Sequence, residues 1–65
     1  MNIGKSIKVA LAKNEMKQTE LAKKIGVTHT YMSAVSNRDT CTGDMLAKLS
    51  EAFNMSASEF IALGE

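Results

Sequence analysis

Side chains that commonly perform covalent or metal chemistry are few in this sequence, and their spacing is not that of a catalytic site. The only histidine, His29, and the only cysteine, Cys41, are twelve positions apart, and the carboxylates are scattered along the chain. This spacing matches no familiar set of metal ligands, and the sequence has no glycine-rich loop that could hold a phosphate. Catalysis requires groups that converge in one pocket. The sequence therefore predicts a protein that is not an enzyme, with no metal site and no cofactor.

Charge is distributed unevenly along the chain of 65 residues, although the net charge is only +1. Residues 1–38 contain seven basic and two acidic side chains, a net charge of +5, whereas residues 39–65 contain one basic and five acidic side chains, a net charge of −4. Such an asymmetry can orient a molecule on a polyanion. Segregation of charge by chance in a small helical domain is the alternative interpretation.

Length and composition place the chain among small globular proteins. The 65 residues suffice for one domain, which we expect to span residues 1–65, and 45% hydrophobic with 23% charged residues is an ordinary globular balance. No apolar run approaches the about 20 residues that cross a membrane, and Lys5 and Lys8 interrupt the first apolar stretch, where a signal peptide would need one. We therefore expect a cytoplasmic protein with no membrane partner. We also expect no second, ligand-sensing domain and hence no small-molecule ligand.

Apolar residues recur with helical spacing along the whole sequence, and no segment alternates with the period of two that is typical of a strand. Thr28 and Thr42 are suitable N-caps, and Ser56 followed three residues later by Glu59 forms a capping box. Gly26 stands where a helix end requires a left-handed residue. Together these patterns predict a compact all-α domain with five helices at residues 3–13, 18–25, 29–36, 43–53 and 57–63.

The most informative segment is the pair of short predicted helices within residues 18–35. Only residues 26–28 separate these helices, too few for an antiparallel hairpin, so the helices must meet at a steep angle. Close approach at that angle requires a small residue, which Ala22 provides. The positions that must face inward in such a pair are all apolar: Leu21, Ile25, Val27, Met32 and Val35. This pattern predicts a helix-turn-helix over about residues 18–36.

With these residues in register, the chain resembles the lambda-repressor-like family of DNA-binding domains, which includes the Cro and phage repressor proteins, over nearly its whole length. The C-terminal sequence NMSASEFIALGE resembles the passage from the fourth to the fifth helix of that family, and THTYMS is similar to the recognition helices of restriction-modification controller proteins. In this family the second helix crosses the DNA backbone and the third lies in the major groove. The resemblance implies a sequence-specific transcriptional regulator, in the first place a Cro-like repressor that binds double-stranded DNA at a pseudo-palindromic operator as a homodimer.

The resemblance also implies which residues contact DNA. Gln18 begins the second helix, where family members bond a phosphate, and Lys17 stands where many members have a Ser or Thr cap. If Met32 and Val35 face inward, the outer face of the third helix consists of Thr30, Ser33, Ala34 and Asn37. The implied DNA contacts are Lys17, Gln18, Thr28, His29, Thr30, Tyr31, Ser33, Asn37 and Arg38. The sequence leaves open that Thr28 is only a cap and that Tyr31 is a half-buried flanking residue.

The predicted recognition helix lacks Arg, Gln and Asn at the positions that would reach the bases. Bidentate contacts to guanine or adenine are therefore scarce, and the Thr and Ser hydroxyls must approach the bases closely. We expect specificity to come from DNA shape, from water or from the loop that contains Arg38.

The last predicted helix contains three large apolar residues, Phe60, Ile61 and Leu63. A helix this short cannot bury all three against its own domain, so we expect them to form the seam of a twofold homodimer that reads two half-sites. Docking of a different protein there, and packing of all three within the domain's own core, are the alternatives. The corresponding alternative function is a protein-interaction module, such as the antitoxin of a toxin–antitoxin pair or an anti-repressor.

Overall fold

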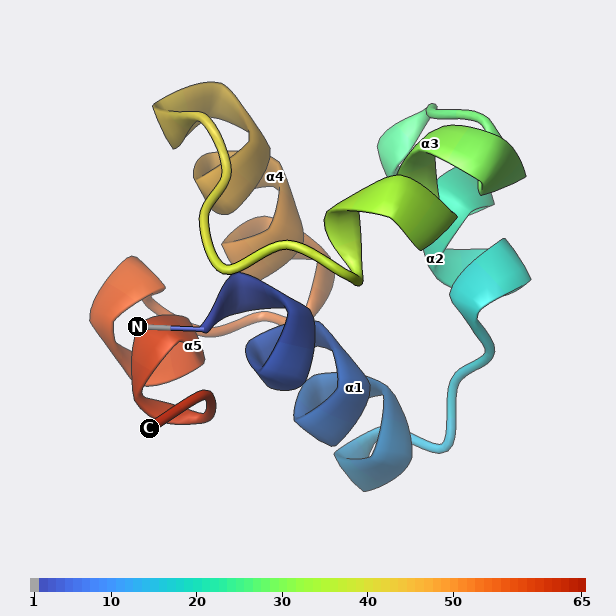
Figure 1. Ribbon diagram of the computed structural model, residues 1–65. Coiled ribbons are helices and arrows are strands. Elements are labelled where there is room, and N and C mark those ends of the chain that lie inside the picture. Colours follow the sequence, from blue (N-terminus) through green and yellow to red (C-terminus); the bar gives the residue numbers. More distant parts are fainter. Residues whose placement is uncertain (1) are drawn as a thin grey trace.

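Five helices make up most of the computed structural model, which describes residues 2–65 (Figure 1). They are α1 (Ile3–Lys13), α2 (Gln18–Ile25), α3 (His29–Val35), α4 (Gly43–Ala52) and α5 (Ala57–Ala62). Residues 2–65 contain no strand, so the predicted all-α fold class with five helices is confirmed. None of these helices is both long enough and apolar enough to cross a membrane. Met1, which the predicted domain includes, lies outside the described residues.

All five helices begin at the predicted residue, and for four of them the reason is a side-chain cap. The caps Asn2, Thr28, Thr42 and Ser56 each accept a hydrogen bond from the backbone N–H three residues further on, over 3.0–3.2 Å. α1 and α2 also end as predicted. The three remaining helices each end one residue earlier than predicted. The last residue predicted for each helix is its C-cap in the structure: Ser36, Phe53 and Leu63.

The start of α2 differs from the other four because its cap residue is Lys17. A lysine ammonium has no acceptor, and no side chain caps the first turn of this helix. Only the reverse half of a capping box is present, in which the N–H of Lys17 donates to Oε1 of Glu20 over 3.3 Å.

One core joins all five helices. Its large, fully buried apolar side chains come from every element, and α1 contributes Ile3 and Ile7. The other helices contribute Leu21, Met32, Val35, Leu49 and Phe60. The rings of Phe53 and Phe60 stack with centroids 6.0 Å apart, which attaches α5 to the end of α4. The orientations of α2 and α3 are therefore fixed by the same core that holds α1, α4 and α5.

Phe60 requires a correction to the predicted dimer seam. Its side chain is 0% exposed, since it packs against Phe53 and the rest of the core. A side chain with no exposed surface has nothing to offer a second subunit, so the prediction that Phe60 lies in a seam is wrong. Ile61 and Leu63 remain half-buried at the surface. Only these two of the three predicted seam residues are accessible to a partner.

Candidate nucleic-acid interface

The turn between α2 and α3 is built around one left-handed residue. Gly26 has φ 76° and ψ 35°, a conformation that glycine adopts without the steric penalty of a Cβ. The N–H of Val27 donates to the carbonyl oxygen of Ala22 over 3.0 Å, and the N–H of Gly26 donates to that of Lys23 over 3.3 Å. These bonds close the end of α2 and turn the chain directly into α3. The predicted left-handed turn at Gly26 is confirmed.

α3 has one buried face and one exposed face. Met32 and Val35 are 0% and 1% exposed, so their predicted inward orientation is confirmed. The side chains on the opposite side of the helix are exposed at Thr30, Ala34 and Asn37, and Ser33 is half-buried beside them. His29 and Tyr31 flank this face, and Tyr31 is 40% exposed, more than a half-buried flanking residue would be. The outer face therefore presents short hydroxyl and amide groups with an aromatic residue at its edge.

Thr28 caps α3 and is also exposed. Its Oγ1 accepts a hydrogen bond from the N–H of Tyr31 over 3.1 Å. The hydroxyl proton is not used in that bond, so it remains able to donate to an acceptor outside the domain. The structure is therefore compatible with both roles that the sequence left open for Thr28.

The first turn of α2 is suited to an anion. Its backbone N–H groups receive no side-chain cap, and the partial positive charge of a helix N-terminus is concentrated there. Gln18 is the first helical residue and is half-buried, while the ammonium group of Lys17 beside it is exposed. A phosphate bound here would meet backbone donors, an amide and a cation together.

The loop that follows α3 carries two exposed polar residues on a fixed backbone. Asn37 donates from Nδ2 to the carbonyl oxygen of Ser33 over 3.0 Å, which leaves its Oδ1 free to accept. Arg38 has an exposed side chain, yet its carbonyl oxygen accepts a hydrogen bond from the N–H of Gly4 over 2.8 Å. Gly4 is not among the residues predicted from the sequence, because a glycine inside a helical pattern does not by itself show which backbone it approaches.

Groups for catalysis or metal binding do not come together in residues 2–65. No cluster of three or more His, Cys, Asp or Glu side chains is placed to hold a metal ion within the described part of the chain. Cys41 is half-buried in the loop before α4, and this burial raises the pKa of its thiol. The nucleophilic thiolate form is thereby disfavoured at neutral pH.

The arrangement of α2, the Gly26 turn and α3 matches a described family of domains. The sequence matches the Cro/C1-type HTH DNA-binding domain over residues 6–63, which is most of the chain. The chain belongs to this family. No curated protein matches it.

As a Cro/C1-type HTH domain, the protein is a DNA-binding protein and not an enzyme. The matched range contains α2 and α3 together with all nine residues predicted to contact DNA. The structure brings Lys17 and Gln18 to one helix start. The predicted contacts in and around α3 are exposed, except for Ser33, which is half-buried. The individual contacts of these nine residues stay predictions. The match begins after Gly4, so this glycine is not part of what the family comparison covers.

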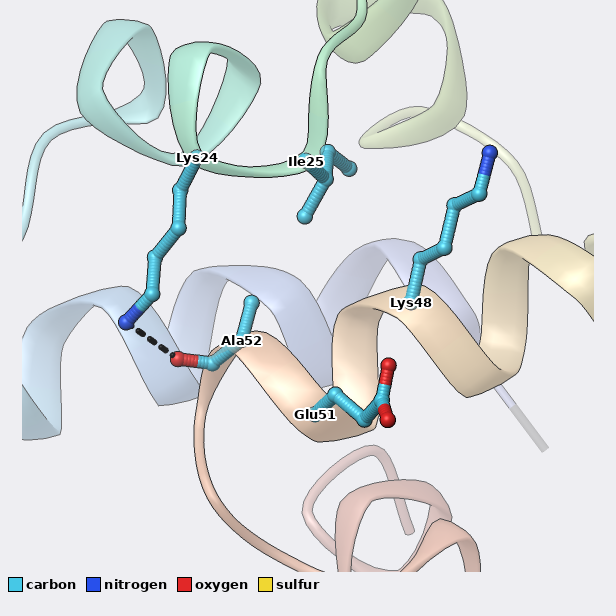
Figure 2. Close-up of a pocket in the computed structure, with 5 residues that line it drawn as sticks. All are labelled: Lys24, Ile25, Lys48, Glu51 and Ala52. Atoms are coloured by element: carbon cyan, nitrogen blue, oxygen red, sulfur yellow. Dashed lines mark hydrogen bonds between the residues drawn. The ribbon is translucent and has the colours of Figure 1, made fainter.

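A shallow hollow of about 320 Å³ lies between α2 and α4 of the Cro/C1-type HTH domain (Figure 2). It is lined by Lys24, Ile25, Lys48, Glu51 and Ala52. The side chain of Lys24 lies along one end of the hollow, and its Nζ donates a hydrogen bond to the carbonyl oxygen of Ala52 over 2.9 Å. The ammonium of Lys24 therefore joins α2 to α4. This structural role was not predicted from the sequence.

Proposed function

We propose that the protein is a sequence-specific transcriptional repressor that binds its operator as a homodimer, with α3 in the major groove. The observation that carries the proposal is the exposed polar face of α3, which the buried Met32 and Val35 hold outward from a rigid core. A helix fixed in this way can enter a groove without first being ordered, which lowers the entropic penalty of binding. Repression follows by steric exclusion of polymerase or of a competing regulator.

Contacts to the DNA backbone position the domain. The first turn of α2, with Lys17 and Gln18, takes one phosphate, and Arg38 in the loop after α3 takes another. Thr28 donates from its remaining hydroxyl proton at the edge of the same surface. Such contacts fix the register of the domain on the duplex and carry no sequence information of their own.

Sequence is read by the short side chains of α3. Thr30 and Ser33 can donate to or accept from base edges only at close range, and neither makes a bidentate contact. His29, Tyr31 and Asn37 lie at the rim of this face. Because direct base contacts are few, a large part of the specificity comes from the shape and deformability of the operator and from bridging water.

A dimer is supported by the place of α5 relative to α3. The two helices lie on opposite sides of the molecule (Figure 1), and Ile61 of α5 and its C-cap Leu63 are half-buried. A twofold seam at these residues leaves both α3 helices uncovered by the partner subunit. Half-sites of the operator would then lie about 34 Å apart, one turn of DNA.

The domain boundaries and the cellular location follow from the same proposal. Residues 1–65 act as one DNA-binding domain, since all five helices share a single core. The protein acts in the cytoplasm of a bacterial or phage-infected cell, where its DNA partner lies.

Selection from a random duplex library at about 150 mM salt tests the proposal, because purely electrostatic binding is suppressed at that concentration. Enrichment of a twofold symmetric site, with half-sites about one helical turn apart, is the expected result. Enrichment of a single half-site retains the DNA contacts but contradicts the dimer.

One observation favours a second function, a protein-interaction module such as an antitoxin or an anti-repressor. Within α3 itself, the outer face offers only Thr, Ser and Ala side chains, none of which contacts a base bidentately, while Ile61 of α5 and its C-cap Leu63 offer apolar surface. Failure of the folded protein to enrich any duplex would favour this alternative over the repressor.

A further inference from the structure

The first turn of α1 is bound to the loop that carries Arg38. The N–H of Ile3 donates to the carbonyl oxygen of Asp39 over 2.9 Å, and the N–H of Gly4 donates to that of Arg38 over 2.8 Å. The N–H of Lys5 donates to Oδ1 of the cap Asn2, and the N–H of Ser6 makes the first ordinary helical bond to the carbonyl oxygen of Asn2. Of the first three helical residues, whose N–H groups have no partner within the helix, two are therefore satisfied by this distant loop and one by the cap.

Gly4 is the residue that allows this approach. It is buried, and a Cβ at this position would overlap the carbonyl oxygen of Ser36 and lie 3.0 Å from that of Arg38. Both obstacles are backbone atoms, so no side-chain rotation relieves the overlap. Gly43, at the start of α4, provides the contrast, since a Cβ there would meet nothing within 4 Å.

The bonds hold the backbone of Arg38 and leave its guanidinium in solvent. A long side chain on a fixed backbone loses less conformational freedom when it binds a phosphate than one on a mobile loop. The positive end of α1 also directs its dipole at the two loop carbonyls, which strengthens the attachment.

We propose that Gly4 is a positioning residue for DNA binding, which holds the loop after α3 so that Arg38 meets a backbone phosphate. This inference rests on the proposed function, in which Arg38 contacts DNA. It adds a residue in a different helix, 34 positions earlier in the sequence, that touches no DNA itself.

The test uses a variant that removes the hydrogen bond without adding atoms. Chemical synthesis of the 65-residue chain with glycolic acid in place of Gly4 exchanges the donating N–H for an ester oxygen. Gly4→Ala is the second variant, Arg38→Ala the reference, and Gly43→Ala the control. Thermal unfolding of each variant sets a temperature at which all are folded. Affinity for a mixed-sequence duplex of about 20 base pairs is then measured from about 50 to 200 mM salt.

We expect Arg38→Ala to reduce the slope of log affinity against log salt by about 1, as for the loss of one phosphate contact. The Gly4 ester should lose about three- to tenfold in affinity with a similar change of slope. The ester should cause no further loss in the Arg38→Ala background, and Gly43→Ala should bind as the parent does.

Two results would overturn the inference while leaving the proposed function in place. One is parental affinity and slope for the Gly4 ester when Arg38→Ala is impaired. The other is an equal loss from the ester with and without Arg38, because Gly4 would then act through general stability. Parental binding by Arg38→Ala would instead contradict the proposed phosphate contact itself.

Discussion

Nζ of Lys24 in α2 lies 2.9 Å from the carbonyl oxygen of Ala52 at the end of α4, and the two are hydrogen-bonded (Figure 2). The bond satisfies one of the carbonyl groups that the last turn of α4 leaves without an internal partner. It also places a positive charge at the negative end of that helix. The contact ties the helix-turn-helix to the C-terminal half of the domain through a side chain that is not among the predicted DNA contacts.

Replacement of Lys24 by Met should therefore lower the free energy of unfolding, by about 0.5–1 kcal/mol given the exposure of the side chain. Lys23→Met is the matched control, since Lys23 is an exposed neighbour on the same helix without such a bond. Urea unfolding of both variants measures the difference. Equal stability of the two variants would show that the bond contributes nothing.

Lys17 has the backbone conformation of an N-cap, with φ −89° and ψ 153°, but lacks a capping side chain. Lys17→Ser should raise the free energy of unfolding by about 0.5–1 kcal/mol, because the serine hydroxyl can accept a hydrogen bond from a backbone N–H of the first turn of α2. The same change should weaken DNA binding and reduce the salt slope by about 1, since it removes a cation. Lys17→Met should show the loss of binding without the gain in stability. A gain in stability with unchanged DNA binding would remove Lys17 from the interface.

Substitutions of Gln18 and of Ser33 should have different effects on DNA binding. Gln18→Ala should weaken binding to all duplexes by about three- to tenfold, because a phosphate contact carries no sequence information. Ser33→Ala should leave average affinity almost unchanged and shift the preferred sequence, with changes of up to about 1 kcal/mol at one position of each half-site. Library selection with each variant separates the two effects. Parental behaviour of both variants would contradict the assigned roles.

Glu59 should contribute to the pH dependence of stability. The N–H of Ser56 donates to its Oε1 over 3.1 Å, and this bond holds the pKa of the carboxyl below its ordinary value of 4.5. A lowered pKa in the folded state gives a stabilisation that is complete above the ordinary pKa and is lost as the pH falls through the lowered one. The stability difference between the parent and Glu59→Gln should therefore shrink from about pH 5 to about pH 3. A difference that is constant over this range would contradict the prediction.

Local features of the sequence predicted the helices well, and features that depend on distant contacts were missed. Thr28, Thr42 and Ser56 act on N–H groups three residues away, and Gly26 acts on its own φ angle, so each determines a boundary by itself. The inward face of α3 followed from helical period alone.

The burial of Phe60 depends on how α5 lies against α4, which the period of a six-residue helix does not determine. The contact of Gly4 with Arg38 and the bond from Lys24 to Ala52 join residues 34 and 28 positions apart. In neither case does the sequence show which carbonyl group is the partner, because backbone carbonyl groups are present at every residue.

Titration of the ¹⁵N-labelled protein with an enriched duplex shows whether DNA binds to the face formed by the start of α2, α3 and the following loop. We expect amide shift changes to concentrate at residues 17–18, 28–33 and 37–38, with smaller changes at residues 3 and 4 through their bonds to the loop. Changes confined to α4 and α5, with α3 unaffected, would contradict binding at this face.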